Sequence, residues 1–107
     1  MTTLIDKDEK KEALRLLMDL ERAQGEHNGR WEDELNIEDS SLQYFEDVTS
    51  IADEIGMEYA KGDSLEFELM QYETDGFCVN KYDAWTFALF EKIEEYLVDI
   101  ILRGYHV

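Results

Sequence analysis

Residues 82–102, YDAWTFALFEKIEEYLVDIIL, decide how this chain folds. Their apolar side chains recur at spacings of three and four, which places them on one face of an α-helix. These side chains are Tyr82, Trp85, Leu89, Ile93, Tyr96, Leu97 and Ile100, with Phe87, Phe90 and Ile101 widening the face. A helix that is apolar over so much of its circumference is usually central to a fold or to a dimer. We therefore expect residues 82–102 to form the central helix.

The residues around this helix indicate where it begins and what it exposes. Asn80 can cap its start, and Gly104 stands where a left-handed cap would end it. Asp83 lies in the first turn, where a carboxylate meets the positive end of the helix dipole. The outward positions are nearly all acidic, with Lys92 as the only base: Asp83, Glu91, Glu94, Glu95 and Asp99.

A second helix is predicted over residues 7–24, near the start of the chain. It ends at Gly25, because Gly25, Asn28 and Gly29 interrupt helices. Residues 25–40 would then form a connection to the next helix. The expected apolar face of this helix contains Leu14, Leu17 and Met18, with Ala13, Leu16 and Leu20 beside it.

Another helix is predicted over residues 41–60. Ser40 is a suitable N-cap, and Gln43 completes a capping box with it. Gly62 ends this helix, unless Gly56 ends it earlier. Its apolar stripe consists of Tyr44, Phe45, Val48, Ile51, Ala52, Ile55 and Tyr59.

Residues 64–79 are ambiguous. Leu65, Phe67 and Leu69 alternate with glutamates, as in a strand, and Asp75-Gly76 is typical of a tight turn. A short helix is the alternative, since Asp63 and Glu66 could cap one. We favour the hairpin. The predicted fold is one domain over 1–107 of the mainly α (α+β) class, with three helices and a small β-hairpin between the second and third.

Charge is the most informative feature of the composition. The 107 residues contain 27 Asp and Glu against 10 Lys and Arg, which gives a net charge of −17. Between Trp31 and Asn80 the only base is Lys61, against fifteen carboxylates. Such a surface repels nucleic acid and anionic membranes, and it attracts basic proteins within the ~8–10 Å Debye length of physiological salt.

No catalytic or metal-binding pattern stands out, and we expect neither an enzyme nor a cofactor. His27 falls in a predicted polar loop and His106 near the end of the chain, without a partner at metal-ligand spacing. Cys78 is the single cysteine, so no internal disulfide is possible, which favours a cytoplasmic protein. The sequence contains neither a signal-like apolar segment at its start nor an apolar run of the ~20 residues that a membrane span needs.

Carboxylates recur at helical spacing in two acid-rich stretches, WEDELNIEDSSLQYFEDVTSIADEIGMEY and YDAWTFALFEKIEEYLVDII. The pairs Glu46/Asp47 and Asp53/Glu54 stand two turns apart, or ~10.5 Å. Duplex DNA carries about one negative charge per 1.7 Å of axis, and a rigid acidic helix presents a field of the same sign.

In size, charge and texture these stretches resemble the small DNA mimics of phages and mobile elements, the Ocr-type anti-restriction and anti-CRISPR class. The resemblance implies inhibition of a basic nucleic-acid-binding protein in a bacterial cell, without direct binding of nucleic acid, and often as a homodimer. The expected contact residues are Glu32, Asp33, Glu34, Glu46, Asp47, Asp53, Glu54 and Glu58, with Glu66 and Glu68 as second-line candidates.

Two alternatives remain open. One is an immunity protein or antitoxin that neutralises a basic nuclease toxin through a compact patch, with Trp31, Tyr44 or Tyr72 as the anchor. The other is an ordinary domain whose acidity only keeps it soluble. Because a solvated surface normally intersperses both signs of charge, the scarcity of bases between Trp31 and Asn80 favours a binding function.

Overall fold

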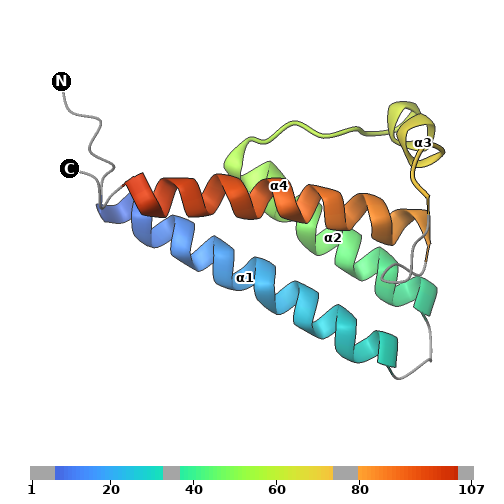
Figure 1. Ribbon diagram of the computed structural model, residues 1–107, viewed down its shortest axis with the longest axis horizontal. Helices are drawn as coiled ribbons and strands as arrows, with labels where there is room; N and C mark the ends of the chain where they lie inside the picture. Colours follow the sequence, from blue (N-terminus) through green and yellow to red (C-terminus); the bar gives the residue numbers. More distant parts are fainter. Residues whose placement is uncertain (1–6, 33–36, 74–79, 104–107) are drawn as a thin grey trace.

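The computed structural model describes residues 7–32, 37–73 and 80–103. These ranges contain four α-helices: α1 (Lys7–Glu32), α2 (Ile37–Ile55), α3 (Asp63–Leu69) and α4 (Lys81–Arg103). In Figure 1, α1, α2 and α4 form an elongated bundle in which α1 is antiparallel to the other two. The molecule measures 49 × 30 × 21 Å along its principal axes. No described helix is both long and apolar enough to cross a membrane.

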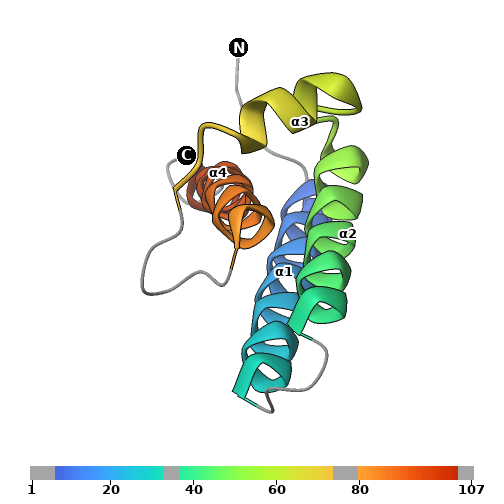
Figure 2. The same cartoon turned by 90° about the vertical axis from the view of Figure 1, so that its right-hand side faces the viewer.

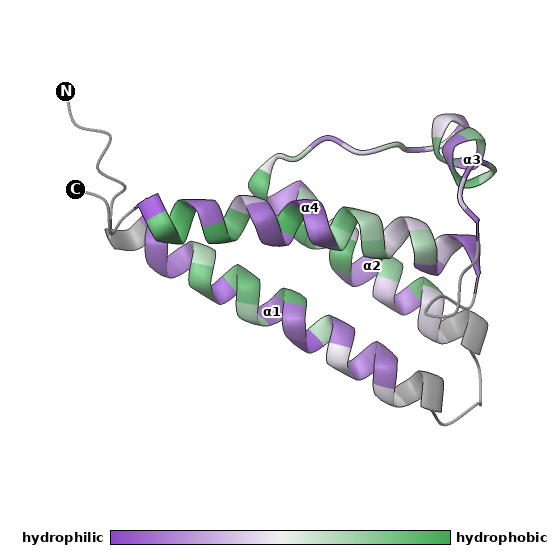
Figure 3. Ribbon diagram, in the orientation of Figure 1, coloured by the Kyte–Doolittle hydropathy of each residue, from purple (hydrophilic) through white to green (hydrophobic). Residues whose placement is uncertain are grey.

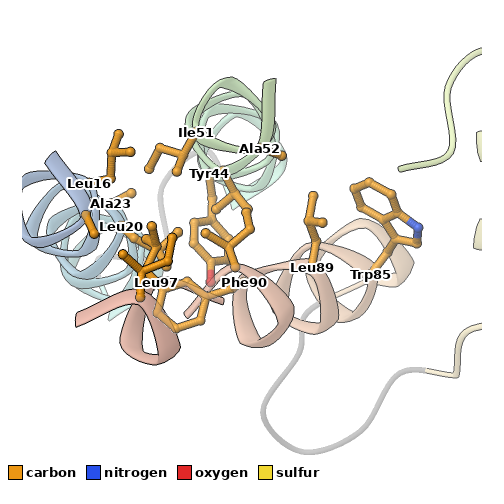
Figure 4. Packing of buried hydrophobic residues seen from close by; sticks show 14 of the residues in the cluster. Leu16, Leu20, Ala23, Tyr44, Ile51, Ala52, Trp85, Leu89, Phe90 and Leu97 are labelled. Carbon is orange, nitrogen blue, oxygen red and sulfur yellow. The ribbon is translucent and has the colours of Figure 1, made fainter. Parts of the chain in front are cut away.

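The core lies where α1, α2 and α4 meet, and α4 is its centre as the sequence predicts. Figure 4 shows side chains from the three helices directed toward one another. Leu20 of α1, Val48 of α2 and Ile93 of α4 are completely buried. Figure 3 shows hydrophilic and hydrophobic residues on different sides of the long helices. This amphipathic pattern is what allows three acidic helices to share an apolar interior.

Asn80 caps α4 as predicted, because its Oδ1 accepts a 2.9 Å hydrogen bond from the Asp83 backbone N–H. The predicted bounds of this helix differ from the observed ones by one residue at each end. The cap satisfies one of the N–H groups that the first turn of a helix leaves without an intrahelical partner. Gly104, the expected end, lies outside the described residues.

The prediction that the first helix ends at Gly25 is wrong, since α1 continues through Gly25 and Gly29 to Glu32. Each internal glycine costs a helix ~1 kcal/mol relative to alanine. The turns after Gly25 offset that cost because they bury His27, whose ring contacts Ser40 and Asp83. Most of the predicted 25–40 connection is therefore helical, and residues 33–36 lie outside the described part of the chain.

The apolar face of α1 also differs from the expected one. Ala13, Leu16 and Leu20 form the buried face, whereas Leu14 and Met18 are exposed to solvent. The two sets adjoin on the helix surface, so periodicity alone did not decide which one meets the core. Exposed large apolar residues elsewhere on the bundle include Leu42, Phe87, Tyr96 and Leu102.

Helix α2 begins at Ile37 and ends at Ile55. The predicted start at residue 41 is therefore wrong, because Ser40 lies inside the helix and is not its N-cap. The predicted end at residue 60 is also wrong, and the earlier stop is the correct one. Gly56 adopts a positive φ of 74°, and the N–H of Met57 donates a 2.9 Å hydrogen bond to the Ala52 carbonyl. A left-handed glycine is the usual end of a helix, because other residues pay a steric cost there. Residues 56–62 then run alongside the bundle toward α3, as Figure 1 shows.

The predicted β-hairpin is wrong in its first half, because residues 63–69 form α3. Leu65 is half-buried and Leu69 is buried, and their spacing of four residues suits a helix, whereas Phe67 faces solvent. Asp63 and Glu66 lie in the first turn, as the short-helix alternative expected. The described residues contain no strand that could have paired with this segment, and an isolated hairpin is only marginally stable. The turn and second strand predicted over 75–79 lie outside the described residues.

Candidate functional site

The outward face of α2 carries four of the predicted contact residues. Glu46, Asp53 and Glu54 are exposed, and Asp47 is half-exposed. The side chains that α2 sends inward, Tyr44 and Val48 among them, occupy the opposite face. Because the two acidic pairs are separated by two helical turns, they stand in line along the helix at ~10.5 Å. We call these four residues the α2 acidic face.

The two ends of the α2 acidic face differ in their neighbours. Near the C-terminal end, the Arg15 guanidinium binds Glu54 at 2.9 Å and the Lys61 ammonium binds Asp53 at 3.3 Å. These contacts are exposed, so each adds little to stability, but each places a positive charge beside a carboxylate. The Asp53 carboxylate also raises the pKa of Lys61. The negative field is therefore weakened at this end.

Near the N-terminal end, Glu46 and Asp47 form no ion pair with any described cation. Asp47 accepts a 2.9 Å hydrogen bond from the Gln43 amide, which is neutral. No described cation offsets this pair, so it is the strongest point of the α2 acidic face for a cationic partner.

The other predicted contact residues do not belong to this face. Glu58 follows α2, and Glu66 and Glu68 belong to α3, which packs beside α4 (Figure 2). Glu58 and Glu68 come together, since both line one cavity against α4. Glu32 is the last residue of α1, and its side chain lies outside the described part of the structure. Asp33 and Glu34 lie outside it entirely. The structure therefore does not test whether these three carboxylates form one surface.

The three aromatic residues that were candidate anchors for a partner have different environments. Tyr44 is 3% exposed and stacks on His27, with 4.6 Å between the ring centroids, so it is a core residue and not an anchor. Tyr72 is partly buried beside Glu68, and burial together with that carboxylate raises the pKa of its hydroxyl. The Trp31 side chain lies outside the described residues.

A buried polar cluster, which the sequence analysis missed, joins the three long helices at one end of the bundle. The His27 ring lies 2.8 Å from Ser40 Oγ through Nδ1 and 3.1 Å from Asp83 Oδ2 through Nε2. The three residues are 6%, 3% and 4% exposed, respectively. His27 is thus not in a polar loop, and Asp83 does not face outward. Buried polar groups need such partners, because an unsatisfied one costs ~1–3 kcal/mol.

These three residue types also make up hydrolase triads, but the arrangement differs from one. In a triad, histidine binds the aspartate through Nδ1 and the serine through Nε2, whereas here the two ring nitrogens are exchanged. A nucleophile must also meet its substrate, and Ser40 is buried. We interpret the cluster as structural. One signal could have revealed it: His27 continues the spacing of Leu16, Leu20 and Ala23, provided that Gly25 does not end the helix.

Among the residues that the structure describes, no group of three or more His, Cys, Asp or Glu could hold a metal ion. Comparisons with protein-family models, with curated proteins and with solved structures found no match for this chain.

Proposed function

We propose that this protein is an inhibitor that binds the basic nucleic-acid-binding site of a bacterial defence or host protein, of the restriction or CRISPR type. The carboxylates of the α2 acidic face would take the place of backbone phosphates. The observation that carries the proposal is the alignment of Glu46, Asp47, Asp53 and Glu54 on the outward side of a helix whose other side is buried. A helix anchored in this way holds its charges in a fixed array, as a mimic of a stiff polyanion requires.

The supporting electrostatics are simple. A partner that binds DNA aligns Lys and Arg side chains to meet phosphates, and a net charge of −17 draws such a surface in from solution. The protein would act in the bacterial cytoplasm by occupying the partner's site, with no catalytic step. A homodimer formed through exposed apolar residues such as Leu14, Met18 and Phe87 would extend the charged surface.

The test begins with capture of a basic protein from a bacterial lysate, followed by competition with duplex DNA. The double variant Glu46→Gln/Asp47→Asn is expected to weaken capture by ~10-fold or more at low salt, since two charge pairs of ~0.7 kcal/mol each would be lost. Asp53→Asn/Glu54→Gln should have a smaller effect, because Lys61 and Arg15 already offset those carboxylates.

A matched control is Glu91→Gln/Glu95→Gln, which removes the same charge from exposed positions of α4. Duplex DNA should displace the partner from the wild-type protein, and the control variant should lose clearly less affinity than Glu46→Gln/Asp47→Asn does. If DNA leaves the captured partner in place, or if the control weakens capture as much as the α2 variants do, the proposal is wrong.

The second candidate, an immunity protein or antitoxin that neutralises a basic nuclease toxin, is favoured by one observation. Tyr72, Glu58 and Glu68 line a single cavity, which is a compact feature and not an extended array. In that case one or two substitutions at the cavity would remove most of the affinity, and the substitutions on α2 would remove little. The capture experiment therefore separates the two candidates.

A further inference from the structure

A cavity of about 190 Å³ lies where the segment after α2 and helix α3 pack against α4. Three aromatic residues line it, Tyr59, Tyr72 and Trp85, together with the carboxylates of Glu58 and Glu68. Pockets for drug-sized ligands measure roughly 300–1,000 Å³. This cavity is smaller, so its size suits a single side chain and not a large metabolite.

The lining is of the kind that recognises cations. Aromatic faces attract a positive charge through the quadrupole of the ring, most strongly when water is excluded. One cation of the chain already uses this property, because the Lys61 ammonium lies 4.7 Å from the centroid of the Tyr59 ring. Lys61 does not line the cavity. Trp85, 3% exposed, meets Tyr59 edge-on with 6.1 Å between the centroids, which fixes the orientation of both rings.

The two carboxylates narrow the choice of cation. A guanidinium group is planar, stacks on aromatic rings and donates several hydrogen bonds at once to carboxylates, whereas an ammonium is compact and strongly hydrated. Arg15 illustrates the second property elsewhere on this molecule, since its guanidinium binds two carboxylates at once, Asp19 at 3.2 Å and Glu54 at 2.9 Å. Glu58 belongs to the segment after α2 and Glu68 to α3, so two parts of the chain each supply a carboxylate to the cavity.

We propose that this cavity is a binding site for a guanidinium group, supplied by an arginine side chain of the basic partner. The identity of that partner rests on the proposed function, whereas the chemistry of the cavity does not. The α2 acidic face would supply long-range attraction, and the cavity would supply a short-range contact that distinguishes an arginine from a lysine.

Lys92 gives the proposal its sharpest test. It also lines the cavity, and its side chain is exposed. Its ammonium adds a positive charge beside the cavity and repels any incoming cation. Removing this charge with Lys92→Gln should therefore strengthen the binding of a guanidinium, by about 3-fold or more. A gain of affinity cannot result from damage to the fold.

The probe is a short peptide whose only charged group is one central arginine side chain. It is titrated into the intact protein while NMR follows the Trp85 indole and the Tyr72 and Glu68 amides. The matched probes contain citrulline, which has the same shape without the charge, or lysine. Methylguanidine, a free guanidinium cation with a single charge, is the third comparison and separates a small-molecule site from a peptide site. The arginine peptide should bind most tightly, the lysine peptide at least 3-fold more weakly, and the citrulline peptide not at all.

Substitutions in the cavity then assign the contacts. Tyr72→Leu removes a ring and should weaken arginine binding by about 3- to 10-fold. Tyr72→Phe keeps the ring and should bind as the wild type does. Glu58→Gln should weaken binding by a similar factor, and circular dichroism checks that each variant remains folded.

Equal binding of the arginine and citrulline peptides would overturn the proposal, as would unchanged affinity in Lys92→Gln. Tighter binding of methylguanidine than of the arginine peptide would overturn the assignment to a partner side chain. The two proposals fail separately. Arginine binding without DNA-displaceable capture overturns the proposed function alone, and DNA-displaceable capture without arginine binding overturns the cavity site alone.

Discussion

Asp83 and Glu46 are both carboxylates on long helices of an acidic chain, and the structure treats them in opposite ways. Asp83 is 4% exposed and contacts the buried ring of His27 at 3.1 Å, whereas Glu46 is exposed on the outward face of α2. The fold depends on the first, and the proposed function depends on the second. Acidity in this molecule therefore has two physical roles, which composition alone does not distinguish.

The difference follows from what surrounds each group. A buried carboxylate must have hydrogen-bond partners, because transfer out of water is otherwise too costly. Solvent stabilises an exposed carboxylate, which stays available to a partner. Asp83 of α4 is consequently held by His27 of α1, which in turn contacts Ser40 of α2. Glu46 has no such fixed partner among the described cations and stays exposed to whatever binds. Three experiments test this contrast.

The largest effect is expected from Asp83→Ala. It removes the acceptor from the buried His27 ring and leaves a space in the core, so the free energy of unfolding should fall by roughly 2–4 kcal/mol. Urea denaturation followed by circular dichroism measures the change. Asp83→Asn keeps an oxygen at the same place and should cost less.

Glu46→Ala is the matched control for Asp83→Ala, because it removes a carboxylate from an exposed helical position. Its effect on the free energy of unfolding should stay within about 0.5 kcal/mol. Equal losses in the two variants would show that the buried cluster has no special role in stability.

A smaller loss in the free energy of unfolding is expected from Asn80→Ala, at the start of α4. The substitution removes the 2.9 Å hydrogen bond to the Asp83 N–H and the 3.2 Å contact from the Asn80 amide to Ser41 Oγ. Loss of an N-cap typically costs ~1 kcal/mol. Thermal unfolding checks the loss, and Asn80→Asp, which still caps a helix, should recover most of it. No recovery in Asn80→Asp would indicate that the contact with Ser41 matters more than the cap.

The smallest effect on the free energy of unfolding is expected from Arg15→Gln, which changes the surroundings of an exposed carboxylate, Glu12. The hydrogen bond from the Arg15 guanidinium holds the pKa of Glu12 below its ordinary value of 4.5, so the substitution should raise that pKa toward 4.5. A lowered pKa in the folded state adds stability above the ordinary pKa, and this contribution is lost as pH falls through the lowered value. The wild type and the variant should therefore differ slightly at neutral pH and converge in acid.

Carbon-detected NMR titration of the Glu12 carboxyl group measures the pKa in Arg15→Gln directly. Lys11→Gln is the control, because it removes a neighbouring exposed cation from the same helix without touching Arg15. A pKa of Glu12 that is the same in Arg15→Gln and in the wild type would contradict the predicted role of Arg15.

Much of the fold could be predicted because the boundaries of α4 follow from residues within and next to the helix itself. Its apolar spacing and its cap at Asn80 each depend only on residues close together in the sequence, so both can be recognised without the structure. The extension of α1 could not be predicted in this way. Gly25 normally ends a helix, unless contacts with residues distant in the sequence offset the free-energy cost of a glycine inside it. The buried contacts of His27 with Ser40 and Asp83 join positions 13 and 56 residues apart along the chain, and no local pattern reveals them.

The same division applies to the candidate site. The alignment of Glu46 with Asp53 follows from helical spacing and was predictable. The cation beside Glu54 was not, because Arg15 reaches it across 39 residues through the packing of α1 on α2. The cavity beside α4 depends on α3 being a helix, and alternation of Leu65, Phe67 and Leu69 favoured a strand instead.

The slight attachment of α3 has a dynamic consequence. This helix is seven residues long, buries only Leu69 among its side chains, and packs on α4 without comparable contacts to α1 or α2. Segments of this kind open by local fluctuation at a far smaller free energy than the global transition, and their amides exchange with solvent first. The protein can therefore widen and close one wall beside Trp85 while the three-helix body stays intact.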